Sequence, residues 1–340
     1  MVKEDILTFG SKRYMMALNR YGKADVIDQV RNHTSCEVKI SFEKTHIIVT
    51  DKYLICTGSF IVSFNDLELF DLSPFGTYRQ INITAFDNAG HIYTKRLSTL
   101  KPEDSKKIYE AVTSRLVSAQ TGLTPATYLD YKRRHADDLL RNAREVMSGR
   151  NLREYKRSYL YGNPVWIYVL VIVGLALVSL VRLIDADTPL QAGSIIFMSL
   201  FLLGVGSIPL FVKSKTYKAY KAFLQENGEE VLEQINNKII YTPDTINKRR
   251  AFVTEKYLVL IGESVMRRED VLWISGYIHK GTWYLDACDK DGNKIHAGLG
   301  RDCSDWMQEE LMISSLLPNS VVFSCEENRK YYEERCKRQV

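Results

Sequence analysis

A segment near the start of this chain returns about two hundred residues later. Residues 49–54, Val-Thr-Asp-Lys-Tyr-Leu, are matched by residues 253–258, Val-Thr-Glu-Lys-Tyr-Leu. Other matches keep the same order, and the offset between paired positions drifts only from 206 at Gly22 to 202 at Gly90. Loop insertions in a duplicated domain produce such a small drift. The sequence therefore predicts two copies of one folding unit.

Each copy shows the same order of local patterns. Helices are predicted at 11–20 and 25–31 in the first copy and at 214–225 and 229–236 in the second, because good helix formers run there without Pro or Gly. Alternation of polar and apolar residues follows, as in 36–42 and 80–86, and favours strands with one buried face. An amphipathic helix closes each copy. This order predicts an α+β fold, a small sheet or barrel capped by a helix.

This order resembles the pleckstrin-homology-like (PH-like) fold, and the chain is similar to bacterial membrane proteins of unknown function that carry tandem PH-like domains. The resemblance is carried by the Thr-(Asp/Glu)-Lys-Tyr-Leu turn, Asp66 and Asp270 at strand starts, Trp273-Ile274, and the Asp-x-x-Gly turn at 87–90 and 289–292. It implies two small PH-like β-roll or barrel domains, each closed by a C-terminal helix. A different small β-roll with a terminal helix is the alternative fold.

Two long uncharged stretches separate the copies, from Ser158 to Val181 and from Thr188 to Val212. A helix needs about 20 apolar residues to cross the hydrocarbon core of a bilayer, and both stretches reach that length. Residues 165–173 are apolar on every face, whereas a surface helix of a soluble protein has a polar stripe. The sequence predicts a transmembrane helical hairpin at 161–213. The alternative is a helical pair buried in a large soluble core.

Basic residues flank both stretches. They are Arg150, Arg153, Lys156 and Arg157 before the first, and Lys213, Lys215, Lys218 and Lys221 after the second. Lys and Arg accumulate on the cytoplasmic side of membrane proteins. The predicted location is the cell membrane, multi-pass with two spans, with both termini and both copies cytoplasmic. The six cysteines form no CxxC pair, which is typical of free thiols in a reducing compartment.

The segment between the first copy and the first uncharged stretch is strongly basic. Thr124-Pro125 is a typical helix start and Gly149 a typical stop, so a helix is predicted between them. From Lys132 to Arg157, basic residues exceed acidic ones by five, which equals the net charge of +5 of the whole chain. Such segments bind anionic headgroups or serve only as a topology signal. The candidate anionic-lipid contacts are Arg133, Arg134, Arg141, Arg144, Arg153, Lys156, Arg157, Lys213 and Lys215.

Sequence motifs for catalysis are missing. The chain has no GxxxxGK(S/T), GxSxG, HExxH or GxGxxG pattern, and its Cys and His residues show no zinc-ligand clustering. We therefore expect no enzymatic activity, no catalytic residue, no cofactor and no metal. The small charge excess, without a recognition motif, also argues against nucleic acid as a partner.

The predicted organisation has five parts. They are a first PH-like repeat with N-terminal helices at 1–120, a basic helical linker at 121–160, the hairpin at 161–213, a second repeat at 214–318, and a charged C-terminal tail at 319–340. Duplicated domains without a catalytic motif favour a membrane-tethered scaffold or adaptor whose partners are the lipid bilayer and another protein. Exposed sheet edges and the groove beside the closing helix are the expected binding surfaces. The alternatives are an anionic-lipid-responsive sensor and an accessory subunit of a larger membrane transport or secretion complex.

Overall fold

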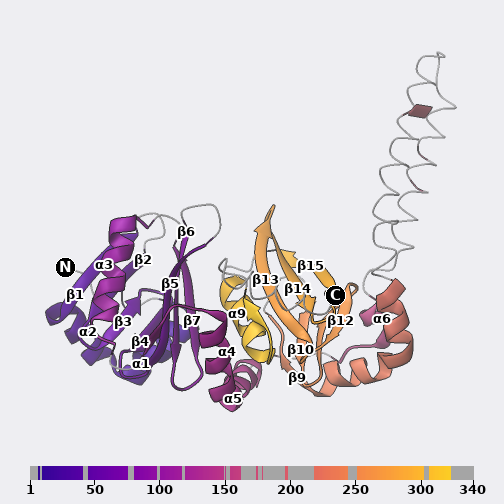
Figure 1. Ribbon diagram of the computed structural model, residues 1–340, viewed down its shortest axis with the longest axis horizontal. Coiled ribbons are helices and arrows are strands. Elements are labelled where there is room, and N and C mark those ends of the chain that lie inside the picture. Colours follow the sequence, from indigo (N-terminus) through magenta and orange to yellow (C-terminus); the bar gives the residue numbers. More distant parts are fainter. Residues whose placement is uncertain are drawn as a thin grey trace. The chain divides into compact units, whose positions relative to one another are not determined.

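The computed structural model forms two compact units. Unit 1 comprises residues 1–150, 240–249 and 267–340, and unit 2 comprises 151–239 and 250–266. The second copy of the repeat is therefore shared between the units. The structure describes residues 7, 10–40, 45–75, 80–97, 100–116, 119–148, 150, 154–161, 174, 178, 196–197, 218–243, 251–301 and 306–322 (Figure 1).

The first copy begins with two helices and a four-stranded antiparallel sheet. These elements are α1 (Lys12–Tyr21), α2 (Lys23–Asn32), β1 (Thr34–Ile40), β2 (Thr45–Thr50), β3 (Tyr53–Cys56) and β4 (Phe60–Ser63), with the strands in the order β1-β2-β3-β4. The Ser11 hydroxyl caps α1 by accepting a hydrogen bond from the Tyr14 amide. Gly22 separates the helices at φ +83°, a conformation that other residues rarely adopt.

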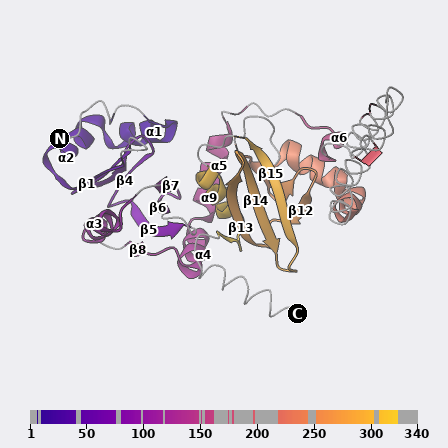
Figure 2. The same cartoon turned by 90° about the horizontal axis from the view of Figure 1, so that it is seen from above.

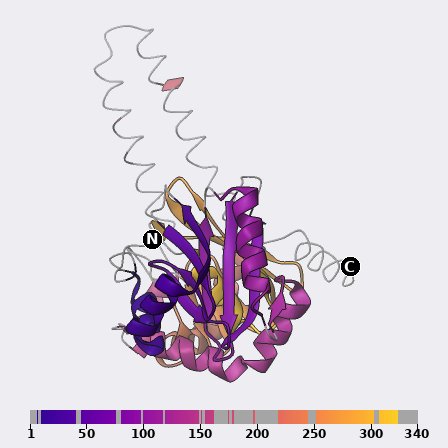
Figure 3. The ribbon, with the colours of Figure 1, turned by 90° about the vertical axis from the view of Figure 1, so that its left-hand side faces the viewer.

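A second sheet and a helix complete the first copy (Figure 3). They are β5 (Leu67–Phe75), β6 (Gln80–Asp87), β7 (Ile92–Leu97), α3 (Pro102–Thr113) and β8 (Gln120–Thr121). The order is β7-β6-β5-β8, and only the pairing of β8 with β5 is parallel. Apolar side chains from both sheets and from α3 form one core, which includes Val49, Leu54, Phe70, Ile83 and Ile108. Helices α1 and α2 cover the other face of the first sheet.

The order of strands and closing helix recurs in the second copy, but one continuous helix takes the place of α1 and α2. Residues 218–237 are helical. They are followed by β9 (Ile239–Tyr241), β10 (Ala251–Thr254), β11 (Tyr257–Leu260), β12 (Ser264–Arg267), β13 (Val271–His279), β14 (Thr282–Asp289), β15 (Lys294–Arg301), α9 (Trp306–Leu316) and β16 (Val321–Val322). The sheets are ordered β12-β11-β10-β9 and β15-β14-β13-β16, and β16 is parallel to β13. The duplication is therefore one of topology as well as of sequence.

The repeated Thr-(Asp/Glu)-Lys-Tyr signature has a structural role in both copies. In the first, the hydroxyl of Thr50 bonds the backbone of Tyr53 across the β2–β3 turn. Lys52 Nζ and the Tyr53 hydroxyl then bind the same carboxylate, Asp25 of α2, at 2.9 and 2.6 Å. The second copy repeats these contacts with Thr254, Lys256, Tyr257 and Glu230. The side chains of the signature connect a helix to a hairpin, so the signature is a structural feature and does not mark a ligand site.

The predicted linker helix is two helices, α4 (Pro125–Arg134) and α5 (Ala136–Ser148). Thr124 and Thr127 form a capping box and Pro125 occupies the first turn of α4, as the start signal predicted. The break falls at His135, whose Nε2 lies 2.6 Å from Glu68 and whose Nδ1 lies 3.3 Å from Asp138. These side-chain contacts hold the non-helical conformation of the break.

The predicted transmembrane hairpin requires correction. Across the part of the chain that the structure describes, no helix combines the length and the apolar character needed to cross a bilayer. This finding contradicts two predictions. The α+β fold with a membrane hairpin is wrong, and so is the location in the cell membrane with two spans and cytoplasmic termini. The start of the first stretch is instead the end of α6 (Arg157–Leu160), where Leu160 packs in the apolar core of unit 2. Most of 158–181 and 188–212 lies outside the described residues.

Candidate functional site

Helix α9 is buried along almost its whole circumference. All of its residues except Glu309 are buried, although a helix that closes one small domain normally keeps an exposed face. The helix contacts β13 and β16 of its own copy and β7 of the first copy, together with α5. Figure 2 shows α9 beside α5 and β13. Within unit 1, α9 therefore joins the two copies.

Gln308 of α9 forms hydrogen bonds with β7, the edge strand of the first copy's second sheet. Its amide nitrogen donates to the Ile92 carbonyl at 2.8 Å, and its amide oxygen accepts from the Thr94 backbone at 3.2 Å. A neighbouring strand would use these same backbone groups of β7. The edge of β7 and the groove beside α9, both expected binding surfaces, are thus occupied by the chain itself.

Lys132 of α4 caps the C-terminal end of α9. Its Nζ lies 3.1, 2.6 and 2.6 Å from the backbone oxygens of Ser314, Leu317 and Ser320. Burial lowers the pKa of Lys132 well below its usual value, while three carbonyl acceptors match the three N–H groups of an ammonium and favour the charged form. These hydrogen bonds connect the linker to the second copy.

Glu310 is a buried ionisable residue of α9. Burial raises the pKa of its carboxyl from 4.5 to about 8, and a hydrogen bond from the backbone of Gly276 opposes that shift only in part. Trp283 Nε1 and Glu310 Oε2 would lie 2.9 and 3.2 Å from a Cβ atom placed on Gly276. Glycine at 276 thus leaves room for these two polar groups.

Unit 1 is expected to lose stability as the pH rises from about 5 to about 8. The unfolded chain releases the Glu310 proton near pH 4.5, whereas the folded chain holds it to about pH 8, so each pH step in between favours unfolding. Glu310→Gln should flatten this part of the profile. Urea midpoints at pH 5, 6.5 and 8 test it, with Glu309→Gln on the same helix as control. Parallel profiles for Glu310→Gln and wild type would contradict the assignment.

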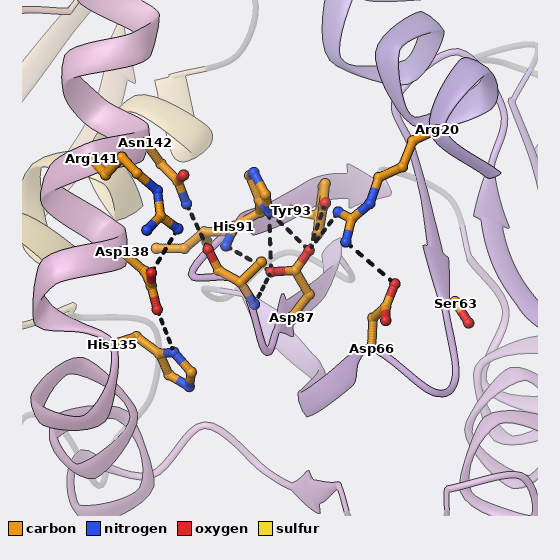
Figure 4. Close-up of polar contacts among 12 residues, drawn as sticks. Arg20, Ser63, Asp66, Asp87, His91, Tyr93, His135, Asp138, Arg141 and Asn142 are labelled. Atoms are coloured by element: carbon orange, nitrogen blue, oxygen red, sulfur yellow. Dashed lines mark hydrogen bonds and ion pairs between the residues drawn. The ribbon is translucent and has the colours of Figure 1, made fainter.

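A polar cluster surrounds the β6–β7 turn of the first copy (Figure 4). The buried carboxylate of Asp87 accepts from the Ala89 and His91 amides and from the Tyr93 hydroxyl, at 3.0, 2.8 and 3.0 Å. The His91 ring lies 3.0 Å and Arg20 Nη1 3.6 Å from the same group. Burial alone would raise the pKa of Asp87, but contacts with His91 and Tyr93 bring it below its ordinary value.

Side chains of α4 and α5 donate hydrogen bonds to the backbone of this turn. Tyr131 of α4 donates to the Asp87 carbonyl at 2.9 Å, and Asn142 of α5 donates to the Ala89 carbonyl at 2.9 Å. In the second copy, the contacts of the Asp289 carboxylate within the described residues are local to its own turn, with the amides of Asp291 and Asn293 and the side chain of Asn293. Because protein groups satisfy the Asp87 carboxylate, this cluster fixes a turn and offers no open ligand site.

The two copies differ on the outer faces of their second sheets. In the first copy, Asp71, Thr84 and Thr94 lie in one line across β5, β6 and β7. All three are buried. The Leu123 amide donates to Asp71 at 3.1 Å, and the Thr84 and Thr94 hydroxyls lie 3.1 Å apart. This polar face is covered by the linker and by α9.

The corresponding line in the second copy is Ser275, Asp286 and His296, across β13, β14 and β15. None of the three is buried. His296 Nδ1 lies 2.7 Å from Asp286, so the imidazole is oriented by a carboxylate. The neighbouring Tyr277 and Tyr284 rings stack at 5.5 Å between centroids, and Tyr284 stacks on His296 at 4.9 Å. We call Tyr277, Tyr284, His296 and Asp286 the aromatic face.

The aromatic face combines apolar rings with polar tips. Tyr277 is 37% exposed. Stacking already restricts the rings, so little of their side-chain entropy would be lost when a partner binds them. The sequence analysis missed these residues. Trp273, Ser275 and Tyr277 occupy every second position of one strand, and this spacing was the signal in the sequence that could have indicated the face.

The predicted lipid contacts are scattered over the two units. Ion pairs join Arg134 with Glu68 and Asp130, Arg141 with Asp138, and Arg157 with Glu229. Arg133, Arg144 and Lys156 are exposed. Arg153, Lys213 and Lys215 lie outside the described residues. Carboxylates close to the three paired arginines weaken the positive potential that an anionic headgroup would meet.

In the described part of the chain, no group of three or more His, Cys, Asp or Glu side chains could hold a metal ion. Cys36, Cys56 and Cys288 are free thiols. No protein-family model matches the chain, and no curated protein matches it significantly. The function must therefore be inferred from geometry, and the aromatic face is the candidate site.

Proposed function

We propose that this protein is a non-catalytic scaffold or adaptor in which two PH-like repeats form one platform and the aromatic face binds a helix of a partner protein. One observation carries the proposal. Asp71, Thr84 and Thr94 on the outer sheet face of the first copy are buried, although the strands of the second copy pair in the same register at the equivalent positions. Among the described residues, those equivalents are half-buried at Ser275 and Asp286 and exposed at His296.

The first copy indicates which kind of element fits such a face. Its occupant α9 is a helix that lies against β7 and satisfies the backbone of that edge strand through Gln308. β15 is the edge strand of the second copy's sheet, as β7 is of the first. A partner helix across β13–β15 would therefore meet Tyr277 and Tyr284 with apolar side chains and β15 with a polar one.

Photo-cross-linking in cells tests this proposal. A photoreactive phenylalanine derivative replaces Tyr277 in one variant and Tyr109 of α3 in the other, because these tyrosines are 37% and 39% exposed. We expect position 277 to give a discrete protein adduct, several-fold stronger than any from position 109, with the bonded peptide in a helical segment. Equal adducts at both positions, or none at 277, would reject the assigned face.

A further inference from the structure

We infer, resting on the proposed function, that the helix bound by the aromatic face is α1 of a second copy of this chain. In the described residues, two helices of unit 1 carry a large apolar side chain that is exposed, Met16 of α1 at 53% and Tyr109 of α3 at 39%. Both α1 and the aromatic face belong to unit 1. One chain therefore supplies the two halves of the contact.

The edge strand of the first copy shows which polar groups such a helix must satisfy. Gln308 of α9 bonds the Ile92 carbonyl and the Thr94 amide of β7. Because β15 pairs with β14 in the register in which β7 pairs with β6, the equivalent groups are the Lys294 carbonyl and the His296 amide. Among the described residues, no side chain takes the place of Gln308 at these two groups. We expect a side-chain amide on the partner helix, since an amide both donates and accepts.

Helix α1 carries such an amide close to its exposed methionine. Asn19 is exposed, and its side chain makes no hydrogen bond within the part of the chain that the structure describes. Asn19 and Met16 are three residues apart, so they lie on one face of the helix, about 4.5 Å apart along its axis. Neighbouring strands are about 4.8 Å apart. With Asn19 at the edge of β15, Met16 lies over β14, next to Tyr284.

The chemistry of the exposed surfaces favours α1 over α3. A methionine thioether makes favourable contacts with the edges of aromatic rings, and the stacked tyrosines of the aromatic face leave ring edges available. Helix α1 has three basic residues and no acidic one, so it meets Asp286 without like-charge repulsion. On α3, the exposed neighbours of Tyr109 are Lys106 and Glu110, which form an ion pair with each other and offer no amide.

The contact joins two different surfaces of the chain, so it is heterologous. In a complex of two chains, one aromatic face and one α1 are still free to bind further chains. Association should therefore continue into longer oligomers unless the rotation between neighbours closes a ring.

Two variants, each lacking one half of the contact, test this assignment in the purified chain. Met16→Glu places a charge on α1, and Tyr277→Glu places a charge on the aromatic face. We expect each variant alone to bind itself at least ten-fold more weakly than the wild type does. An equimolar mixture should form complexes of two chains and nothing larger, because a single intact pair of surfaces is left. Sedimentation velocity distinguishes these species.

Tyr109→Glu is the matched control, because Tyr109 is nearly as exposed as Tyr277 but lies on α3. This variant should associate like the wild type. A monomeric wild type, undiminished association of Met16→Glu or Tyr277→Glu, or a mixture that stays monomeric would overturn the inference. The cross-linking experiment separates the two proposals. An adduct of position 277 with a different protein would support the aromatic face as a binding site and reject α1 as its occupant, whereas the absence of any adduct would reject both.

Discussion

Replacing Asp87 by alanine is expected to destabilise unit 1 by about 3–5 kcal/mol. The change leaves the half-buried amides of Ala89 and His91 and the buried hydroxyl of Tyr93 without their acceptor. It also removes one of the two carboxylates near Arg20. An unsatisfied buried donor costs about 1–3 kcal/mol, so several together exceed the effect of a typical core substitution. Urea unfolding monitored by tryptophan fluorescence measures the loss.

The second copy supplies the matched control for this substitution. Asp289→Ala removes the equivalent carboxylate, but its partners belong to an exposed turn and can bond water instead, so the expected cost is about 1 kcal/mol or less. The contribution of Asp87 should also depend on pH. Since the folded pKa of Asp87 is depressed, its contribution is present above the unfolded value of 3.8 and disappears as the pH falls through the folded value. Equal losses for the two variants would contradict this account.

Replacing Lys132 by methionine is expected to destabilise unit 1 by about 2–3 kcal/mol. The ammonium binds three backbone oxygens at the end of α9, and methionine of similar length offers them no donor. Removal of the buried charge recovers part of the cost. The oxygens of Ser314 and Leu317 also accept backbone N–H groups, which limits the loss further.

Arg133→Met is the control for Lys132→Met, because Arg133 is the next residue of α4 and is exposed. A surface substitution of this kind should change the free energy of unfolding by less than about 0.5 kcal/mol. Hydrogen exchange should also show faster exchange of the amides of α9 in Lys132→Met alone. If α9 exchanged equally in both variants, Lys132 would not be what holds this helix end.

Local signals in the sequence predicted much of each copy. Alternation located β6, the Asp-Lys turn located the β2–β3 hairpin, and Thr124-Pro125 located the start of α4. In contrast, Gly228 was expected to separate two helices as Gly22 does, yet 218–237 is one continuous helix. The glycine in the first copy adopts a positive φ and begins a new helix, which residue type alone does not determine.

Long-range packing explains what the sequence could not predict. Gln308 and Lys132 look like ordinary surface residues of amphipathic helices, and only the approach of α9 to the first copy buries them. Likewise, Thr84 and Asp286 occupy equivalent positions, but Thr84 is buried and Asp286 is half-buried. No local pattern encodes which of two similar faces another part of the chain will cover. The membrane hairpin was predicted from hydropathy alone, and Leu160 shows how an apolar side chain in such a stretch can instead belong to a domain core.

The pairing of Gln308 with β7 also constrains how the protein is made. The amide of Gln308 and the backbone of Thr94 are 214 residues apart in sequence, so the ribosome has long since released β7 when α9 emerges. Throughout that interval the growing chain presents an unfilled strand edge, the kind of surface through which nascent polypeptides aggregate. Fragments that stop before Trp306 should carry the same liability permanently, whereas full-length chains lose it on completion.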